Sequence, residues 1–229
     1  MSETATISKA TKNSPAGLCS GQQASKRRAT NRDRIVSESV GIFNRMGAGS
    51  TSTNHICAAL GISPGNLYFH FKNKEEIVFA IFEQMCEETY ALWKEALDSR
   101  DILPPLRFIE ASMEIFWRYR FFHREMYHLR RQDPELSRRW HKHLERTRRF
   151  MRAAFAKWVR SGYVTTVGDA FTFRMINDIV LVTASSFFQF YESPDRPATT
   201  KPLQIANQYL ARFLQPYLTP EYAKTVFPL

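Results

Sequence analysis

The sequence predicts an all-α protein of about nine helices. Apolar residues recur at three- and four-residue spacing along most of the chain, and no segment shows the strong two-residue alternation of a half-buried strand. Gly, Pro and small polar residues separate these periodic stretches where helices are expected to begin and end. The 229 residues include 18 Phe, which is enough apolar material for a sizeable core.

Residues 1–30 are the exception, because they lack hydrophobic periodicity and are rich in Ser, Thr, Ala, Gly and Gln. We expect a disordered leader there that ends in the basic cluster Lys26-Arg27-Arg28. An amphipathic helix then runs from Asn31 and ends at Gly47.

Two short helices are expected next. The first runs from Ser52 to Leu60 and is broken by Gly61. Ser63 is a good N-cap and Pro64 suits a first helical turn, so a third helix is expected over residues 64–71. These three helices form a predicted domain over residues 31–77.

A longer helical region follows. Asn73-Lys74-Glu75-Glu76 opens a helix that runs to about Ser99, with acidic residues in its first turn as the helix dipole prefers. Asp133-Pro134 is a clear helix start and Gly162 a clear stop. The remaining helices are expected at 105–119, 121–131, 134–160, 168–191 and 202–217. They belong to a second domain over residues 78–219, followed by a tail at 220–229.

The second and third helices have the pattern of a helix-turn-helix, whose second helix enters the major groove of DNA. Gly61 can adopt the backbone conformation that the turn needs, and Leu67 and Phe71 would hold the third helix against the other two. Three polar side chains then face outward: Asn66, Tyr68 and His70. Such groups can hydrogen-bond phosphates or base edges. The alternative is that a two-turn aromatic helix is simply part of the core.

The run TSTNHICAALGISPGNLYFHFKNKEEI (residues 51–77), preceded by the helix that ends at Gly47, resembles the N-terminal domain of TetR-type transcriptional regulators. Within it, LYFHFKNK is the most specific part. The resemblance implies a homodimer in which a three-helix DNA-binding head precedes a helical body for ligand binding and dimerisation. It also implies that helix 64–70 recognises double-stranded DNA at a palindromic operator, and that the protein is a repressor.

The same resemblance implies roles for individual residues. Phosphate contacts are expected from Thr51, Tyr68, His70, Lys72 and Lys74. Base readout is expected from Ser63, Pro64, Gly65 and Asn66, and Asn66 is the preferred candidate because Asn pairs well with adenine. The arm from Lys26 to Arg34, with Arg28 as its representative, either contacts DNA or is a solvated linker.

The net charge of +10 points to an anionic partner. Residues 31–95, however, carry six basic and eight acidic residues, a net of −2, so DNA contact there depends on a few well-placed groups. Residues 118–160 carry 14 basic residues against four acidic ones. This run is either a solvated face or an anion site, for extra DNA backbone or for a ligand such as an acyl-coenzyme A or another anionic hydrophobic molecule.

Aromatic residues in the second domain belong either to the core or to a ligand pocket. The candidates for the pocket are Phe116, Trp117, Phe122, Met126, Phe150, Met175 and Ile179. Residues 119–140 also resemble the body of a TetR subgroup that includes regulators of polyhydroxyalkanoate metabolism.

Helix 168–191 is apolar on most sides, so it must be buried, and helix 202–217 adds another apolar stripe. The family resemblance implies that these two helices form the homodimer interface about a two-fold axis. The alternative is a monomer that buries both helices itself.

Other classes of protein are disfavoured. No apolar run approaches the ~18 to 20 residues needed to span a bilayer, and the N-terminus lacks a signal-peptide core, which predicts a cytoplasmic protein without membrane contact. The three cysteines form no disulfide framework, and no histidine pair has the i,i+4 spacing of a helical metal site. No catalytic motif or cofactor-binding loop is present in the sequence. The sequence therefore predicts a ligand-responsive regulator that is not an enzyme and needs no cofactor, and the rival is a non-specific basic nucleic-acid-binding protein.

Overall fold

The computed structural model describes residues 30–98, 102–166, 168–192 and 201–227. Within these ranges the chain forms ten α-helices and one 3-10 helix, with a single isolated bridge between Val164 and Leu218 and no strand. The helices are α1 (Asn31–Met46), α2 (Thr53–Leu60), α3 (Pro64–His70), α4 (Lys74–Asp98), α5 (Pro105–Arg118), α6 (Arg120–Gln132), α7 (Pro134–Arg160), α8 (Ala170–Tyr191), α9 (Lys201–Leu214), the 3-10 helix η1 (Gln215–Tyr217) and α10 (Pro220–Val226). The prediction of an all-α protein is confirmed.

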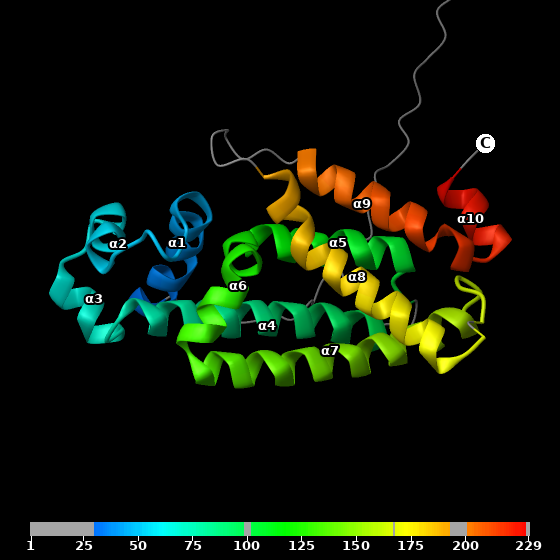
Figure 1. The fold of residues 1–229 in the computed structure, drawn as a ribbon, viewed down its shortest axis with the longest axis horizontal. Coiled ribbons are helices and arrows are strands. Elements are labelled where there is room, and N and C mark those ends of the chain that lie inside the picture. Colours follow the sequence, from blue (N-terminus) through cyan, green and yellow to red (C-terminus); the bar gives the residue numbers. More distant parts are fainter. Residues whose placement is uncertain (1–29, 99–101, 167, 193–200, 228–229) are drawn as a thin grey trace, which may run out of the picture.

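Helices α1 to α3 form a head at one end of an elongated molecule, and the other helices form its body (Figure 1). Each head helix begins at a side-chain cap that its sequence supplies. Thr30, Ser52 and Ser63 accept hydrogen bonds from backbone N–H groups in the first turns of α1, α2 and α3. The helix-turn-helix expected over α2 and α3 is present.

The turn between α2 and α3 depends on Gly61. Its φ of 64° and ψ of 37° place it in the left-handed region, where Gly is favoured, and the Ile62 N–H reaches back to the Cys57 carbonyl oxygen at 3.1 Å. A Cβ atom added at Gly61 would meet no atom within 4 Å. The constraint at this position is therefore conformational and not steric.

We expect Gly61→Ala to lower the free energy of unfolding by about 1 kcal/mol, because only the left-handed backbone is penalised. Gly65→Ala is the matched control, since an added Cβ there meets only the Ser63 Oγ atom at 3.9 Å, an ordinary contact, and Gly65 lies inside helix α3 without a positive φ. Chemical denaturation of both variants measures the difference. Equal stability of the two would show that the turn does not impose this conformation.

A continuous core joins the head to the body. Phe43 of α1 packs against Phe121 of α6 with ring centroids 5.1 Å apart, and Phe82 of α4 stacks on Phe122 of α6 at 5.2 Å. Trp140 of α7 completes this aromatic group. Helix α4 runs without interruption from the head into the body, so the boundary expected at 77–78 lies inside a helix and inside a shared core.

The body is built around α4, α5 and α7, with α8 and α9 packed across them (Figure 1). A second core lies between α5, α8 and α9, with Met113, Phe188 and Leu210 among its buried residues. Helix α10 covers one end of this core, although residues 220–229 were expected to be a tail. Its start signals are Thr219, which caps it, and Pro220, but a helix of seven residues shows too little periodicity to stand out.

Helix α8 corrects one expectation about membranes. By length and composition its 22 residues would suffice to cross a bilayer, so the expectation that no run approaches that length is wrong. Only 28% of its most apolar window is buried within the chain. The alternative of a monomer that buries α8 by itself is therefore disfavoured, because much of the apolar surface of α8 is exposed in the single chain.

Candidate nucleic-acid interface

Helix α3 is fixed to the head on one side and open on the other. The Ser63 hydroxyl accepts the Asn66 N–H at 3.2 Å, and the Leu67 side chain is fully buried under the helix. Pro64, Gly65 and Tyr68 are exposed. The Tyr68 hydroxyl lies 3.1 Å from the Thr53 hydroxyl, which ties α3 to the first turn of α2. This arrangement presents one face of α3 at the end of the molecule.

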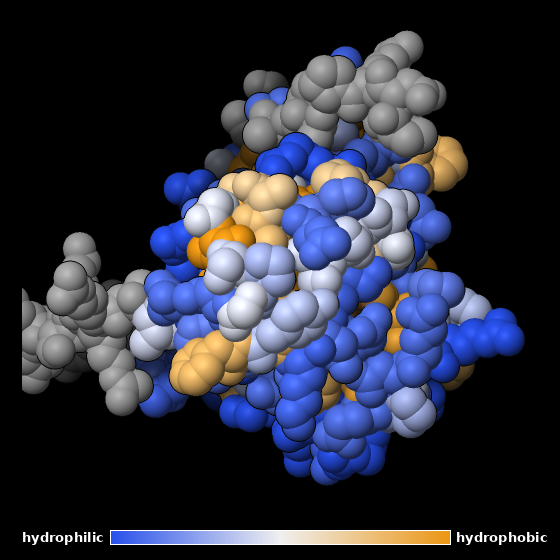
Figure 2. Space-filling model, turned by 90° about the vertical axis from the view of Figure 1, so that its left-hand side faces the viewer, coloured by the Kyte–Doolittle hydropathy of each residue, from blue (hydrophilic) through white to orange (hydrophobic). Residues whose placement is uncertain are grey.

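Figure 2 looks at the molecule from this end and shows a mostly hydrophilic surface with separate apolar patches. Phe69 is one apolar residue of α3 that the sequence analysis did not select, and it is 83% exposed. Its ring meets His70 edge to face at 5.0 Å. A signal for it was available, because two residues along a helix rotate the side chain by about 200°, which places Phe69 opposite the buried Leu67. An exposed ring of this kind can contact a thymine methyl group.

Asn66 and His70 are less open than expected. Both side chains are half-buried, and the Asn66 Oδ1 atom is buried without a hydrogen-bond partner among the described residues. Asn66 lies one residue before Leu67, so its side chain is rotated by only about 100° from the buried face of the helix. Reading a base through Asn66 would require the amide to rotate outward.

Two of the expected phosphate contacts have other partners. Thr51 is buried and precedes α2, and its hydroxyl donates to the Gly47 carbonyl oxygen at 2.7 Å. The Lys74 ammonium donates to the Ala48 carbonyl oxygen at 2.5 Å and lies 3.5 Å from that of Gly49. Both side chains therefore hold the loop between α1 and α2. In the structure both side chains bond loop carbonyl oxygens, and the phosphate contacts expected from them stay predictions.

Lys72 is exposed beside α3, as expected, and its backbone N–H donates to the Glu76 carboxylate at 2.8 Å. Arg28 lies outside the described residues. The described part of the arm places Arg32 over the Phe71 ring at 4.9 Å and joins Arg34 to the Leu60 carbonyl oxygen at 2.9 Å. Both arginines thus support α2 and α3 from α1.

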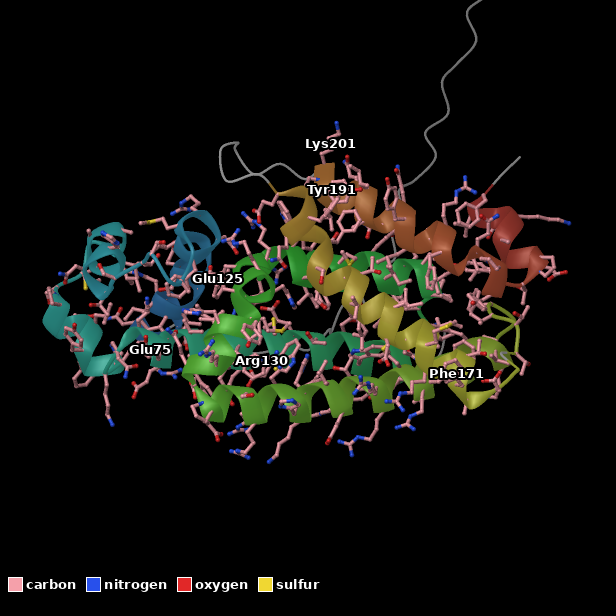
Figure 3. All side chains as sticks on the ribbon, viewed as in Figure 1. Glu75, Glu125, Arg130, Phe171, Tyr191 and Lys201 are labelled. Atoms are coloured by element: carbon pink, nitrogen blue, oxygen red, sulfur yellow. The ribbon has the colours of Figure 1, made fainter. Side chains whose placement is uncertain are left out.

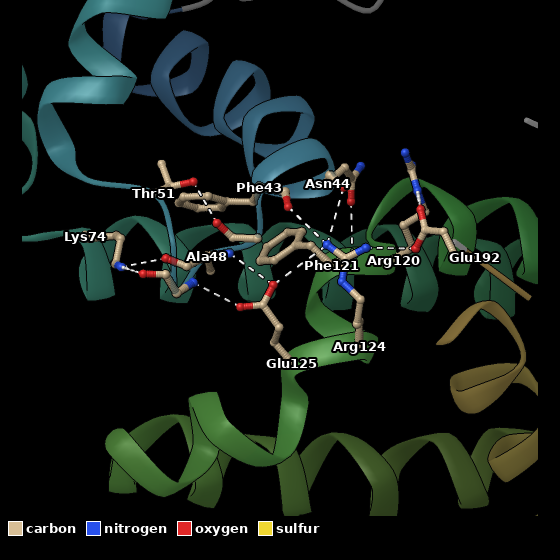
Figure 4. A network of polar contacts seen from close by, with 12 residues as sticks. Phe43, Asn44, Ala48, Thr51, Lys74, Arg120, Phe121, Arg124, Glu125 and Glu192 are labelled. Atoms are coloured by element: carbon tan, nitrogen blue, oxygen red, sulfur yellow. Dashed lines mark hydrogen bonds and ion pairs between the residues drawn. The ribbon is translucent and has the colours of Figure 1, made fainter. Parts of the chain in front are cut away.

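The loop after α1 is held by α6 through a head–body joint formed by Asn44, Ala48, Gly49, Arg124 and Glu125, most of which Figure 4 labels. The Glu125 carboxylate accepts the N–H groups of Ala48 and Gly49, each at 3.0 Å. Asn44 donates to the Arg118 carbonyl oxygen at 2.8 Å and accepts the Phe121 N–H at 3.0 Å. The joint connects backbone groups of the head directly to side chains and backbone of the body.

The joint continues to the end of α8. Arg124 donates to the Phe43 and Asn44 carbonyl oxygens on one side and pairs with Glu192 at 2.8 Å on the other. Arg120 also pairs with Glu192 at 2.8 Å. Glu192 is the C-cap of α8. A movement of α8 or α6 therefore has a hydrogen-bonded route to the head.

The body contains a cavity of about 140 Å³ between α4, α5, α6, α7, α8 and α9. Of the seven residues expected to line a pocket, Phe116 lines it and the other six do not. Trp117, Phe122, Met126 and Phe150 pack in the hydrophobic cores instead. Met175 and Ile179 are exposed on the outer side of α8. Helical spacing identifies an apolar face, but it does not reveal which part of that face meets empty space.

The outer side of α8 carries a row of exposed apolar residues along the helix. Figure 3 labels Phe171 and Tyr191 near the two ends of α8. The row consists of Phe171, Met175, Ile179, Val182 and Phe190. Tyr209 of α9 is exposed as well and lies 5.8 Å from Phe187, centroid to centroid. An exposed row of apolar side chains of this kind is typical of an interaction surface.

Two family models together cover most of the chain. Residues 35–81 match a model described as "Bacterial regulatory proteins, tetR family", and residues 81–226 match one described as "Bacterial transcriptional repressor". Among curated proteins, the HTH-type transcriptional regulators UidR of Escherichia coli K12 and O157:H7 are each 39% identical over 67 residues, 29% of this chain. The match spans about a third (34%) of the length of these relatives.

Solved structures extend the similarity to the body. A TetR-family transcriptional regulator from Marinobacter aquaeolei is 30% identical with a TM-score of 0.70, over 86% of this chain and 95% of that one. The TetR-family regulator PfmR from Thermus thermophilus is 26% identical with a TM-score of 0.61, over 80% of this chain and 98% of that one. The head and the body thus share one arrangement with these regulators.

Proposed function

Because the chain belongs to the TetR family and is a DNA-binding transcriptional regulator and not an enzyme, we propose that it is a homodimeric, effector-responsive repressor acting in the cytoplasm. The single observation that carries the DNA site is the open face of α3, pinned beneath by Leu67 and presenting Tyr68 and Phe69. Ser63, Pro64 and Gly65 lie at the N-terminal end of that face, which enters the major groove first.

The dimer is supported by the exposed apolar row on α8, together with Tyr209 of α9. A two-fold interface brings the same face of two copies together. It would cover apolar surface that a single chain leaves in water, and it would place two copies of α3 on one DNA duplex. The operator is therefore a palindrome whose half-sites are about one helical turn, or multiples of one turn, apart.

Effector response is supported by the position of α6. This helix contributes His123 to the cavity wall and, two residues later, Glu125 to the head–body joint. An effector that favours one position of α6 would shift the head together with this helix. It can shift the equilibrium between the two positions only by as much as its binding free energies to them differ. The resemblance of residues 119–140 to regulators of polyhydroxyalkanoate metabolism stays a prediction about the genes controlled.

Selection of bound duplexes from a random-sequence pool tests the regulator. We expect recovery of one palindrome, with specific binding about 10³-fold or more tighter than binding to unrelated DNA. A non-specific basic protein would enrich no sequence, and its affinity would depend only on salt and phosphate density. That outcome would overturn the proposal.

Lys72→Ala is expected to weaken binding to all duplexes alike and to reduce the slope of log affinity against log salt by about 1 for each subunit. The reason is that Lys72 is exposed beside α3. Lys94→Ala removes an exposed lysine from the second half of α4, outside the basic run of residues 118–160, and serves as the control. Titrations at several salt concentrations measure both slopes. An unchanged slope for Lys72→Ala would exclude a phosphate contact there.

A further inference from the structure

The cavity in the body has walls without charge. No Asp, Glu, Lys or Arg lines it among the described residues, although residues 118–160 contain 14 Lys and Arg. Figure 3 shows long side chains projecting from the outer side of α7, away from the body. Moving an ionised group into such an interior without an opposite charge is strongly unfavourable. The walls therefore select against an anionic group, including the phosphates of a coenzyme A.

Most polar side chains on the cavity wall already have partners. Four of them donate to carbonyl oxygens one turn earlier in their own helices: Thr89, Ser112, Asn177 and Ser185. The His143 Nδ1 atom lies 3.0 Å from the Tyr90 hydroxyl. These bonds stabilise the wall and leave few groups to orient a ligand.

Two buried atoms on the wall have no hydrogen-bond partner in the described part of the chain, the His123 Nδ1 atom and the Thr147 hydroxyl. His123 is 7% exposed and Thr147 is 5% exposed. Proteins rarely leave buried polar atoms unpaired. A hydroxyl both donates and accepts, and a neutral imidazole does one at each nitrogen, so the two groups suit a hydroxyl or carbonyl oxygen of a ligand.

The two histidines on the wall add no charge at neutral pH. Burial, and to a lesser degree the charge of His143, lowers the pKa of His123 to about 3. Burial also lowers the pKa of His143 to about 4, with a smaller effect from Arg146. His143 and Thr147 are one turn apart on α7. The two unpaired polar atoms of the wall thus come from α6 and α7, which pack against each other, while the polar side chains from α4, α5 and α8 are already bonded within their own helices.

The cavity volume sets the size of the ligand. At about 140 Å³, it is close to the engineered apolar cavity of about 150 Å³ that admits benzene. Resting on the regulator proposed above, we propose that the effector is an uncharged, mostly apolar molecule of benzyl alcohol's size. Its single hydroxyl or carbonyl oxygen bonds His123 and Thr147.

Three probes of one shape test the charge preference on the full-length protein without DNA: benzyl alcohol, benzoate and benzylamine. Trp93, Trp140 and Trp158 line the cavity, so their fluorescence and the melting temperature both report binding. At pH 7 we expect benzyl alcohol to bind at least about tenfold more tightly than either charged probe. Equal or tighter binding of a charged probe would overturn the proposal, as would failure of benzyl alcohol to bind.

Thr147→Val tests the polar anchor, because it removes the hydroxyl and keeps the side-chain shape. We expect benzyl alcohol to bind about threefold to tenfold more weakly and toluene, which has no oxygen, to bind unchanged. Thr225→Val on α10 is the control, since that hydroxyl bonds the Tyr222 carbonyl oxygen on the surface. Retained toluene binding shows that the cavity is intact, and an equal loss of both probes would overturn the assignment of Thr147.

The two proposals fail separately. Probe binding is measured without DNA, so a protein that binds benzyl alcohol selectively but selects no palindrome would keep its cavity assignment and lose its regulator role. A protein that selects a palindrome but binds the probes without regard to charge would keep its regulator role. Release of the selected operator by benzyl alcohol, and not by benzoate, would join the two.

Discussion

Val182→Glu is expected to leave the protein monomeric and to abolish tight operator binding. Val182 lies near the middle of the exposed apolar row on α8 and is 64% exposed in the single chain. In a two-fold interface each substitution enters twice, so two carboxylates would be placed against apolar surface or against each other. Like charges brought together in this way cost several kcal/mol. Each monomer would then hold only one half-site, and the gain of about 10² to 10⁴ from binding two half-sites together would be lost.

Sedimentation equilibrium and operator titration measure these two effects. Tyr127→Glu is the matched control, because Tyr127 is 74% exposed on α6 and lies outside the apolar row. We expect it to leave the dimer intact. A Val182→Glu protein that remains dimeric would place the interface on another surface.

Glu125→Gln is expected to destabilise the fold and to weaken communication between body and head. The carboxylate accepts two backbone N–H groups, whereas the glutamine amide offers one oxygen and turns its NH₂ group towards the second N–H. Ala48 is buried, so an unpaired N–H there has no access to water. Leaving a buried donor unpaired costs about 1 to 3 kcal/mol.

Chemical denaturation measures the loss, and an unchanged denaturant slope would show that the unfolded state is the same. Glu145→Gln on the exposed side of α7 is the control and is expected to change stability by less than about 0.5 kcal/mol. In the same Glu125→Gln variant we expect effector to release less operator, because the loop after α1 is held to α6 by one fewer hydrogen bond. Full stability together with full effector response would show that the joint is not the route of coupling.

The local features of this fold could be predicted from the sequence, because their causes lie within a few residues. Ser63-Pro64 and Asp133-Pro134 predict the starts of α3 and α7, and the Ser63 and Asp133 side chains cap these helices in the structure. Gly61 predicts the turn between α2 and α3, and it adopts the left-handed conformation there. Such signals act on backbone groups within a few residues, so they do not depend on the tertiary structure.

The features that depend on distant residues could not be predicted in the same way. Glu125 captures backbone groups 77 and 76 residues away, at Ala48 and Gly49, and no local pattern marks that pairing. Lys74 follows α3 at a position where a phosphate contact was expected. In the structure its ammonium group donates to the carbonyl oxygen of Ala48, 26 residues earlier in the chain. The lining of the cavity could not be predicted either, and six of the seven residues expected to line it do not. An apolar residue that fills a core and one that lines an empty space show the same helical periodicity.

Helix α4 would convert a small tilt in the body into a larger displacement of the head. It has 25 residues. At about 1.5 Å per residue it is about 37 Å long, so a tilt of about 5° at its far end moves the head by about 3 Å. Because α4 is continuous from the head into the body, a tilt of this helix would carry the head with it. In the proposed dimer, two such helices would move two heads at once, while DNA offers successive major grooves at a fixed spacing of about 34 Å. In the proposed regulator, a rearrangement no larger than a side chain in the body would thus be amplified into a mismatch that the duplex could follow only by bending.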